Sequence, residues 1–379
     1  MALSRRFLIL AEGSFGPLSS KTANACIRYI PDEVAAVLDS GTAGRTAHDV
    51  LGFGGHIPVV ASFEAGMAQH PTALLIGIAP AGGQFPDAWR SMVSDALRAG
   101  LDVWSGLHTL LGDDREFAAL AAASGATIRD LRRAPTGLEV ASGRGRDLDA
   151  TIVLTVGSDC NIGKMTAQLQ VQSSVRQLGH RVNFAATGQT GILVEGRGIA
   201  VDAVIADFIA GAAESLTIEA AAEADIVLVE GQGSIIHPAY SGVTLGLMHG
   251  ALPHAMVLCA QPSRTTIHRN PWVPIPSLSE MIRLYESAME PLRPSPVIAI
   301  ALNTFDLDDR EAREAIERAR AETGLPTTDP VRYEPLVIAE AIAAFHVERV
   351  AERVAERVAD RVADRVADRT VLIPPAIFG

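Results

Sequence analysis

Residues 151–166 read TIVLTVGSDCNIGKMT, and this stretch decides how the rest of the chain is interpreted. A short apolar, β-branched run ends at Gly157, and a second glycine, Gly163, precedes Lys164, Met165 and Thr166. The helix-forming run AQLQVQSSVRQL follows. Strand, glycine-containing turn, lysine, hydroxyl and helix is the order of a phosphate-binding loop.

The backbone N–H groups of such a loop turn inward, and the helix N-terminus adds about half a positive charge. Lys164 would supply a point charge, and Ser158 or Thr166 a hydroxyl. The match to G-x-x-x-x-G-K-S/T is imperfect, because Ser158 replaces the first glycine and Met165 separates the lysine from the threonine. An ordinary strand–turn–helix is the alternative, but Lys164 is one of only two lysines in the chain, which favours phosphate binding. The predicted cofactor-binding residues are Gly157, Ser158, Asn161, Gly163, Lys164, Met165, Thr166 and Asn303.

Length and composition set limits on the fold and on the partners. The chain has 379 residues, which is typical of about two domains, and 48% apolar with 20% charged residues indicates a well-packed protein. A net charge of −12 provides no basic field for nucleic acid. No apolar run approaches the roughly 18 residues of a membrane span, so we expect a cytoplasmic protein. Three widely spaced cysteines form neither a disulfide framework nor a zinc site.

Strands that alternate with helices and end in glycine turns indicate an α/β protein with mainly parallel sheets. We predict a Rossmann-like domain over residues 1–140, a linker near 135–147, and a P-loop NTPase-like domain over 148–379. In the first domain, the turn at 79–83 lies among the strand ends where ligands of such sheets collect.

The chain closes with a four-residue repeat, VERVAERVAERVADRVADRVADR. Its composition favours a helix, which we place at about 347–369. Four residues advance about 400° on a helix, so the valines drift around it and form no heptad seam. We therefore expect a surface helix that touches a neighbouring subunit of a homo-oligomer.

Acidic and imidazole side chains stand at or near the phosphate loop. Glu230 follows the strand ADIVLV, and Asp159 lies inside the loop. These carboxylates suit Mg²⁺ binding, proton acceptance in a metal-free site, or simple capping of a helix. His237, in the irregular segment GSIIHPAYSG, is a candidate general base or a hydrogen-bonded structural histidine.

Other polar residues suit a small anionic substrate. Gln189 and Gln232 stand in glycine turns, where neutral donors can orient a carboxylate, and Arg264 lies in the polar run QPSRTTIHRNP. The residues predicted to bind substrate are Lys21, Arg28, Gln189, Gln232, Tyr240 and Arg264.

With these residues assembled, the chain resembles a family long labelled as a domain of unknown function, which includes the DgcN-type D-glutamate N-acetyltransferases. In the C-terminal domain the resemblance lies in GSDCNIGKMT, ATGQTGI, VDAVIADFIAGAAE, VEGQGSIIHPAYSGVTLGLMHG and IALNT, and in the N-terminal domain in SSKTANACIRY, LDSGTAG, IAPAGG and SGLHTLLGDD. More distantly, GSDCNIGK with VEGQG is similar to dethiobiotin synthetase, an ATP-dependent P-loop enzyme.

The family resemblance implies acetyl transfer from acetyl-CoA to the amino group of D-glutamate; we assign no metal ligand, and the sequence leaves the metal requirement open. The loop would hold the phosphates of coenzyme A, Asn303 would meet the adenine, and Glu230, Asp159 or His237 would take the proton of the attacking amine. In the rival interpretation ATP and Mg²⁺ occupy the loop, and a small carboxylate is ligated or phosphorylated. A nucleotide-binding regulator without turnover is the third class.

Overall fold

The computed structural model describes the backbone of residues 5–17, 19–78 and 83–370, with the side chains of these residues except 360 and 362–370. The chain divides into two compact units. Unit 1 comprises residues 1–142 and 185–216, and unit 2 comprises residues 143–184 and 217–379. The predicted ligand turn at 79–83 lies outside the described residues except for Gly83.

Unit 1 is built on a six-stranded parallel sheet with the order β3-β2-β1-β4-β5-β6. This is the strand order of a Rossmann fold. The apolar runs that predict strands form β1 (Phe7–Leu10), β2 (Val34–Leu38), β3 (Val59–Val60), β4 (Ala73–Ile76), β5 (Asp102–Ser105) and β6 (Ile128–Asp130). The helices between them are α1 (Lys21–Tyr29), α2 (Ala47–Leu51), α3 (Phe63–Met67), α4 (Arg90–Arg98) and α5 (Arg115–Ser124).

Unit 2 contains a second six-stranded sheet, with the order β14-β13-β10-β7-β9-β8. Its strands are β7 (Thr151–Gly157), β8 (Val182–Ala185), β9 (Ile226–Val229), β10 (Ala255–Ala260), β13 (Val297–Leu302) and β14 (Thr327–Thr328). The central strand β7 is buried along its whole length and pairs in parallel with β9 and β10. Its helices are α6 (Lys164–Gln177), α9 (Ser241–Ala251), α10 (Leu278–Met289), α11 (Asp309–Thr323) and α12 (Leu336–Thr370). Two parallel-sheet α/β domains, Rossmann-like and P-loop-like, are therefore confirmed.

One segment of the later sequence belongs to unit 1. Residues 185–216 carry α7 (Gln189–Glu195) and the start of α8 (Ile209–Ala221). Leu193 of α7 joins the apolar core of the first sheet, and Arg132 forms an ion pair with Asp202. Gly211 packs closely against the backbone of Glu139, because a Cβ on Gly211 would lie 1.7 Å from the carbonyl oxygen of Glu139.

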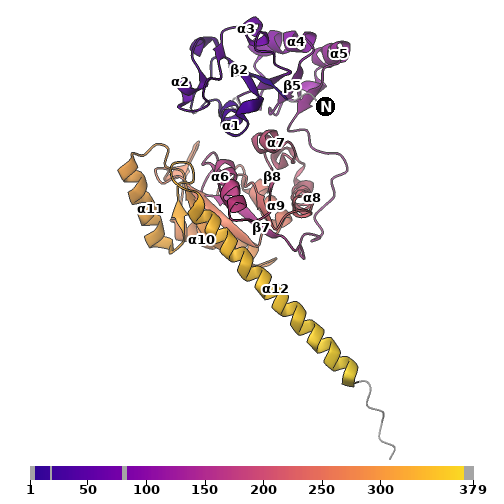
Figure 1. The fold of residues 1–379 in the computed structure, drawn as a ribbon, viewed down its shortest axis with the longest axis vertical. Helices are drawn as coiled ribbons and strands as arrows, with labels where there is room; N and C mark the ends of the chain where they lie inside the picture. Colours follow the sequence, from indigo (N-terminus) through magenta and orange to yellow (C-terminus); the bar gives the residue numbers. More distant parts are fainter. Residues whose placement is uncertain (1–4, 18, 79–82, 371–379) are drawn as a thin grey trace, which may run out of the picture. The chain divides into compact units, whose positions relative to one another are not determined.

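The arginine–valine repeat lies within α12, which runs along unit 2 and projects past it (Figure 1). The first part of this helix packs against α6 and β13. Farther on, Val354 and Val358 are each 55% exposed, while Arg349 and Arg353 donate to the carbonyl oxygen of Leu148. Among the described residues, no helix combines the length and the apolar character that a membrane span needs.

The central strands β7 and β9 approach so closely at one point that only glycine fits. Gly231, which follows β9, donates its N–H to the Thr155 hydroxyl at 2.9 Å. A Cβ on Gly231 would lie 1.7 Å from the Thr155 carbonyl oxygen. The backbone after β9 is thereby held against β7, next to the loop that β7 leads into.

Replacing Gly231 with alanine should lower the free energy of unfolding by about 2–3 kcal/mol, because the new Cβ meets backbone that cannot give way. Gly242→Ala, in α9, is the matched control. A Cβ there meets nothing within 4 Å, so its stability should stay within about 1 kcal/mol, with a small gain from helix propensity. Urea unfolding of both variants measures the difference, and equal stabilities would contradict the close approach.

The buried imidazole of His254 should make the free energy of unfolding depend on pH. Its Nδ1 accepts the N–H of Ile152 at 3.0 Å, and burial, helped by nearby arginines, lowers the pKa of His254 to about 2. The unfolded chain therefore binds a proton below its ordinary pKa of about 6.5 while the folded chain does not, so stability falls as pH falls. From pH 7 to pH 5 the loss from this group should be about 2 kcal/mol.

The His254→Asn variant keeps an acceptor for Ile152 and removes the titration. Comparing urea unfolding of the two proteins at several pH values isolates the contribution of the histidine. If both proteins lose stability equally between pH 7 and pH 5, His254 is not held neutral in the folded state.

Candidate functional site

The site is centred on the turn that joins β7 to α6. Gly157 ends the strand, and Lys164 is the first residue of the helix. Asn161 and Gly163 have φ values of 53° and 97°, so the turn uses left-handed backbone where asparagine and glycine are tolerated. Strand, turn and helix therefore form where the sequence predicts them.

Lys164 folds back over its own loop. Its side chain is buried, and Nζ donates to the carbonyl oxygen of Asp159 at 2.7 Å. A Cβ on Gly157 would lie 3.1 Å from the same Nζ, so Gly157 leaves room for the amine. The loop thus keeps a positive charge at the N-terminus of α6, where the helix dipole has the same sign.

Asp159 is a fully buried carboxylate whose oxygens receive several donors. Oδ1 accepts the N–H of Cys160 at 2.6 Å, and Oδ2 accepts the guanidinium of Arg264 at 2.9 Å and the N–H of His268 at 2.8 Å. Arg264 also donates to the Cys160 carbonyl oxygen at 2.8 Å. Asp159 therefore fastens the loop to the segment before the hairpin of β11 (Thr266–Ile267) and β12 (Asn270–Pro274), through Arg264, and to the turn of that hairpin, through His268. Its predicted role as a base, and that of Arg264 as a substrate ligand, stay predictions.

Tyr285 fixes the start of the loop through hydrogen bonds of its hydroxyl. Its hydroxyl, carried by α10, is fully buried, donates to the Gly157 carbonyl oxygen at 2.7 Å and accepts the N–H of Ile235 at 3.0 Å. A single phenol thus joins the phosphate-type loop to the segment after β9. Burial raises the pKa of Tyr285, so the group stays protonated and neutral.

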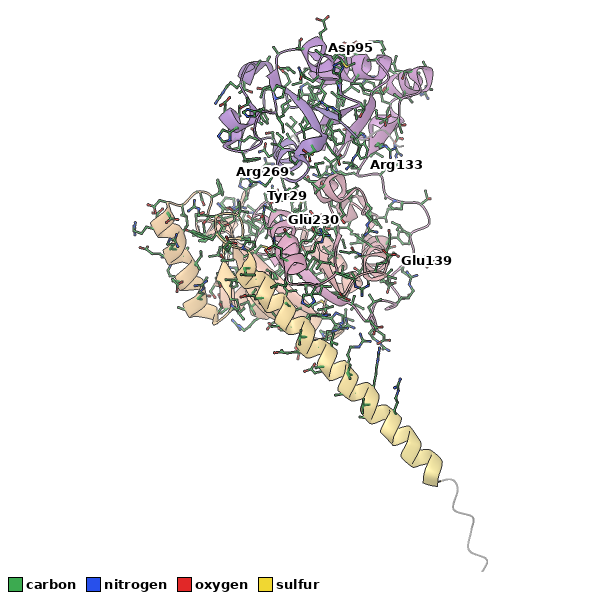
Figure 2. The ribbon with its side chains drawn as sticks, viewed as in Figure 1. Tyr29, Asp95, Arg133, Glu139, Glu230 and Arg269 are labelled. Carbon is green, nitrogen blue, oxygen red and sulfur yellow. The ribbon has the colours of Figure 1, made fainter. Side chains whose placement is uncertain are left out.

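Glu230 and His237 lie on the segment after β9. Glu230 is buried within unit 2 (Figure 2), and a Cβ on its neighbour Gly231 would lie 3.1 Å from Cδ of Lys164. The carboxylate predicted as a base therefore directly precedes the glycine that packs against the loop lysine. Gln232 turns the chain here, and its carbonyl oxygen accepts the Thr244 hydroxyl at 2.8 Å.

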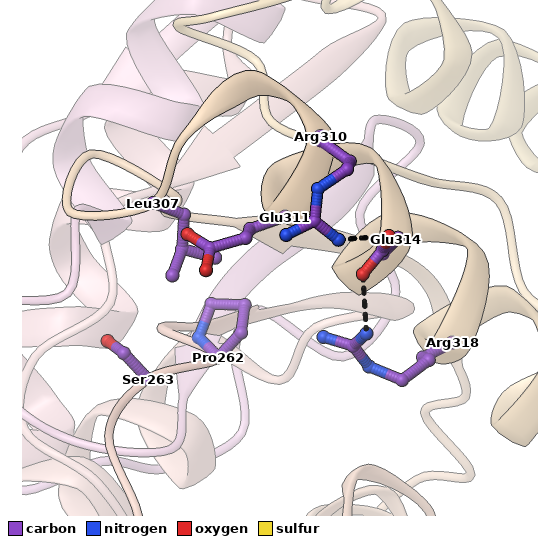
Figure 3. Close-up of a pocket in the computed structure, with 7 residues that line it drawn as sticks. All are labelled: Pro262, Ser263, Leu307, Arg310, Glu311, Glu314 and Arg318. Atoms are coloured by element: carbon purple, nitrogen blue, oxygen red, sulfur yellow. Dashed lines mark hydrogen bonds and ion pairs between the residues drawn. The ribbon is translucent and has the colours of Figure 1, made fainter.

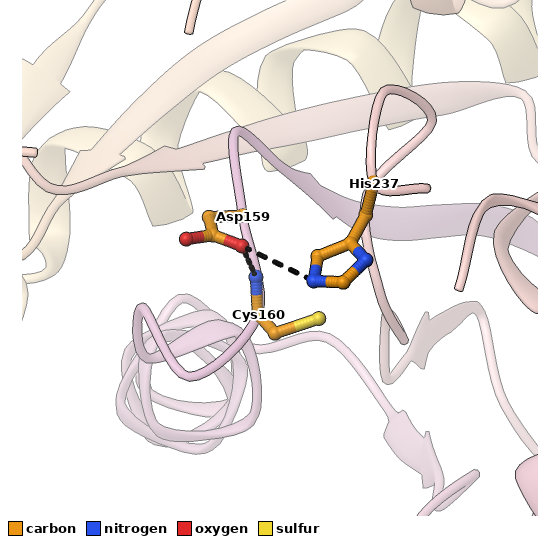
Figure 4. Close-up of side chains that lie close together, drawn as sticks. All are labelled: Asp159, Cys160 and His237. Carbon is orange, nitrogen blue, oxygen red and sulfur yellow. Dashed lines mark hydrogen bonds and ion pairs between the residues drawn. The ribbon is translucent and has the colours of Figure 1, made fainter. Parts of the chain in front are cut away.

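The surroundings of His237 select one tautomer. Nδ1 accepts the N–H of Ala239 at 3.1 Å, so in the neutral ring the proton is on Nε2. Nε2 faces Asp159, 3.9 Å from Oδ1 (Figure 4), and Tyr240 packs on the ring with a centroid distance of 4.5 Å. Burial, and secondarily the charge of Lys164, lower the pKa of His237, against the opposing effect of Asp159. As a general base His237 stays a prediction; in this tautomer it offers a hydrogen-bond donor.

A thiol completes this cluster. The Sγ of Cys160, a carboxylate oxygen of Asp159 and a ring nitrogen of His237 lie within 4.8 Å of one another. These atom types can hold a metal ion, but the guanidinium of Arg264 already neutralises Asp159 at 2.9 Å. A divalent cation would have to displace or tolerate that charge, so the donor set fits a metal poorly.

A shallow cavity of about 330 Å³ lies at the carboxyl ends of β10 and β13 (Figure 3). Its lining mixes apolar and charged side chains: Pro262, Ser263, Leu307, Arg310, Glu311, Glu314 and Arg318. Asn303 follows β13, and its amide nitrogen is 3.6 Å from where a Cβ on Gly163 would be. The residue predicted to meet an adenine therefore borders the loop, in the chain segment that leads to this cavity.

The remaining predicted substrate ligands lie in unit 1. Lys21 begins α1, Arg28 stacks its guanidinium over Phe53 at 3.9 Å, and Gln189 is the first residue of α7 and not part of a turn. Gln189 packs against Gly106 of the same unit. Their contact with substrate stays a prediction.

Sequence reasoning missed two residues of the site. Tyr285 sits inside an amphipathic helix 128 residues from Gly157, and no local pattern marks it. Cys160 did carry a signal, because it lies in the loop next to Asp159, but its wide spacing from the other cysteines excluded it as a metal or disulfide residue.

The sequence profile described as the P-loop domain "Domain of unknown function (DUF1611_C)" matches residues 139–338, and the Rossmann-like "DUF1611_N" matches residues 40–134. The chain is 38% identical over 287 residues to a D-glutamate N-acetyltransferase of Tritonibacter scottomollicae, covering 75% of this chain and 84% of that protein. A D-glutamate N-acetyltransferase of a Pseudoalteromonas species is 38% identical over 259 residues, covering 68% and 77%.

A crystal structure agrees with these sequence matches. A DUF1611 family protein from Anabaena variabilis is 41% identical and superposes with a TM-score of 0.86, over 90% of this chain and 99% of that one. The family resemblance predicted from the sequence is thereby confirmed. The chain belongs to the DUF1611 family, whose members join a Rossmann-like N-terminal domain to a P-loop C-terminal domain.

Proposed function

We propose that the chain is an acyltransferase that moves the acetyl group of acetyl-CoA to the amino group of D-glutamate. The observation that carries this proposal is its 38% identity, over most of both chains, to two relatives named D-glutamate N-acetyltransferase. The substrate and its chirality come from those relatives. Acetyl-CoA as donor comes from the chemistry of the transfer and from the resemblance noted above.

The geometry of unit 2 is compatible with this reaction. The turn before α6 presents the helix N-terminus and the buried amine of Lys164 to an anionic part of the donor, either its phosphates or the oxyanion formed during transfer. The cavity beyond Asn303 is the place that we assign to the nucleotide end. Arg310 and Arg318 line it, and both pair with Glu314, so a phosphate there would compete with that carboxylate. Glu230 is the carboxylate that we assign to removing the proton of the attacking amine.

The ATP- and Mg²⁺-dependent ligase or kinase is the second candidate. The P-loop topology of unit 2 is the observation in its favour. The pairing of Asp159 with Arg264 speaks against it, because the carboxylate that would hold the metal is already neutralised.

A thiol-release assay tests the proposed function. With acetyl-CoA and D-glutamate, the protein should release free coenzyme A and form N-acetyl-D-glutamate, identified by mass spectrometry, while L-glutamate reacts more slowly. ATP consumption without thiol release would overturn the proposal in favour of the ligase or kinase.

Lys164→Met keeps the packing of the buried side chain and removes its charge. We expect kcat/KM for acetyl-CoA to fall by the equivalent of about 1.5–3 kcal/mol, as for the loss of a charge-assisted contact. Calorimetry with coenzyme A then separates the two roles: weaker binding indicates phosphate contacts, and unchanged binding with lower kcat indicates oxyanion stabilisation.

The control for this substitution is Arg283→Met, which removes a positive charge from an exposed side chain whose ion pair with Glu280 is 3.9 Å long. Its kinetics should match those of the unaltered protein. If Lys164→Met also leaves both binding and kcat unchanged, the loop takes no part in the reaction.

A further inference from the structure

We propose that Cys160 is the nucleophile of the transfer, and that it carries the acetyl group as a thioester between acetyl-CoA and the amine. This inference rests on the proposed acetyl transfer and adds a covalent intermediate to it. It starts from the cluster of Cys160, Asp159 and His237, whose ligand-type atoms lie within 4.8 Å of one another in unit 2 (Figure 4).

The three cysteines of the chain differ in their surroundings. Cys26 and Cys259 are fully buried, and burial raises the pKa of the Cys26 thiol and raises that of Cys259 to about 12, so both remain inert thiols. Cys160 is partly exposed and lies in the turn before α6. It is therefore the cysteine that a thioester can reach.

The turn around Cys160 is suited to an anionic sulfur. Reactive cysteines are found at helix N-termini and beside cationic or imidazole groups, which stabilise the thiolate. Here the negative charge of Asp159 is already balanced by Arg264, and the amine of Lys164 is held in the same loop. The sulfur thus sits in a loop where the nearest carboxylate is already paired.

His237 is the imidazole beside the Cys160 thiol. The side chain is 4% exposed, Nδ1 is occupied by the N–H of Ala239, and the Nε2–H points into the cluster. Nε2 lies 3.9 Å from Oδ1 of Asp159, which is beyond hydrogen-bond distance. Because a ring nitrogen of His237 and the Cys160 sulfur lie within 4.8 Å of each other, we assign the Nε2–H to donating to the thiolate, and then to the oxyanion that forms on the acetyl carbonyl.

The acetyl group is transferred in two steps. The Cys160 thiolate attacks the acetyl carbon, a new S–C bond forms, and the S–C bond to coenzyme A breaks, so that coenzyme A leaves as a thiolate and takes a proton from water. The neutral amine of glutamate then attacks the acetyl-cysteine, its N–C bond forms, and the Cys160 thiolate leaves. The proton lost by the amine goes to a base, for which Glu230 is placed on the adjacent segment. His237 donates hydrogen bonds throughout and gives up no proton.

A nucleophile at Cys160 also determines where acetyl-CoA binds. If the acetyl thioester lies at Cys160, the turn contacts the reacting carbonyl, and the phosphates of coenzyme A lie farther along its extended arm. The cavity lined by Arg310, Arg318 and the Glu314 that pairs with both is then the place for the nucleotide end.

The decisive experiment uses the full chain with acetyl-CoA and no glutamate. After an acid quench, the intact protein should gain the mass of one acetyl group, and peptide mapping should place it on Cys160. Adding D-glutamate before the quench should remove the adduct and yield the N-acetylated product. Initial rates at varied concentrations of both substrates should give the parallel lines of a ping-pong mechanism.

Substitutions of the cysteines distinguish a nucleophilic role of Cys160 from a purely structural one. Cys160→Ala should lose the adduct and reduce kcat by at least about 10³-fold, and Cys160→Ser should also fail to form a thioester. Cys26→Ala, in the core of unit 1, is the matched control and should keep both the adduct and the ping-pong pattern. Thermal unfolding of each variant shows that it is folded, which we expect for Cys160 because its side chain is not in the core.

Two outcomes would overturn the inference without touching the proposed function: thiol release by a Cys160→Ala variant at near the original rate, or intersecting kinetic lines with no acetylated protein. Stoichiometric metal in the purified protein, lost together in Cys160→Ala and His237→Ala, would also overturn it by making the cluster a metal site. Absence of thiol release from the unaltered protein would instead reject the proposed function itself.

Discussion

The shape of the site depends on one buried carboxylate. Asp159 is inaccessible to solvent, and its oxygens accept hydrogen bonds from a guanidinium and from backbone N–H groups. The same contacts fasten the turn between β7 and α6 to the segment that carries Arg264. Removing the guanidinium would leave a buried charge less compensated, so electrostatics help to hold the turn and the distant segment in register.

Around this ion pair, the polar side chains of the site hold the backbone of the loop and of its neighbours in place. Tyr285 and Asp159 use their oxygens on backbone groups of the loop and of its neighbours. Lys164 and His237 also bond to backbone groups here, Lys164 to the carbonyl oxygen of Asp159 and His237 to the N–H of Ala239. A preorganised set of donors costs little reorganisation when negative charge develops, which is the requirement of acyl transfer.

The two-unit organisation divides the chain differently from its sequence order. The path leaves unit 1 at residue 142, forms β7, α6 and β8, and returns to unit 1 for residues 185–216. Leu193 shares the core of the first sheet, and Gly211 touches backbone near the end of the N-terminal portion. The chain thus passes between the units three times, and unit 1 is completed by a segment from the later part of the sequence, residues 185–216.

The sequence by itself determined the elements whose signals are local. Apolar runs that end in glycine, the order of Gly157, Gly163 and Lys164, and the alternation of strands with helices were enough to predict two parallel sheets and the loop between β7 and α6. These features depend on residues a few positions apart, where period and turn chemistry act directly.

Only the tertiary structure decided which groups meet. Arg264 reaches Asp159 across 105 residues, Tyr285 reaches Gly157 across 128, and the N–H of Ala239 sets the tautomer of His237. Such contacts follow from strand order and from helix packing, and no periodicity in the sequence encodes them. For the same physical reason the cysteine next to Asp159 looked isolated in the sequence and has an imidazole beside it in the fold.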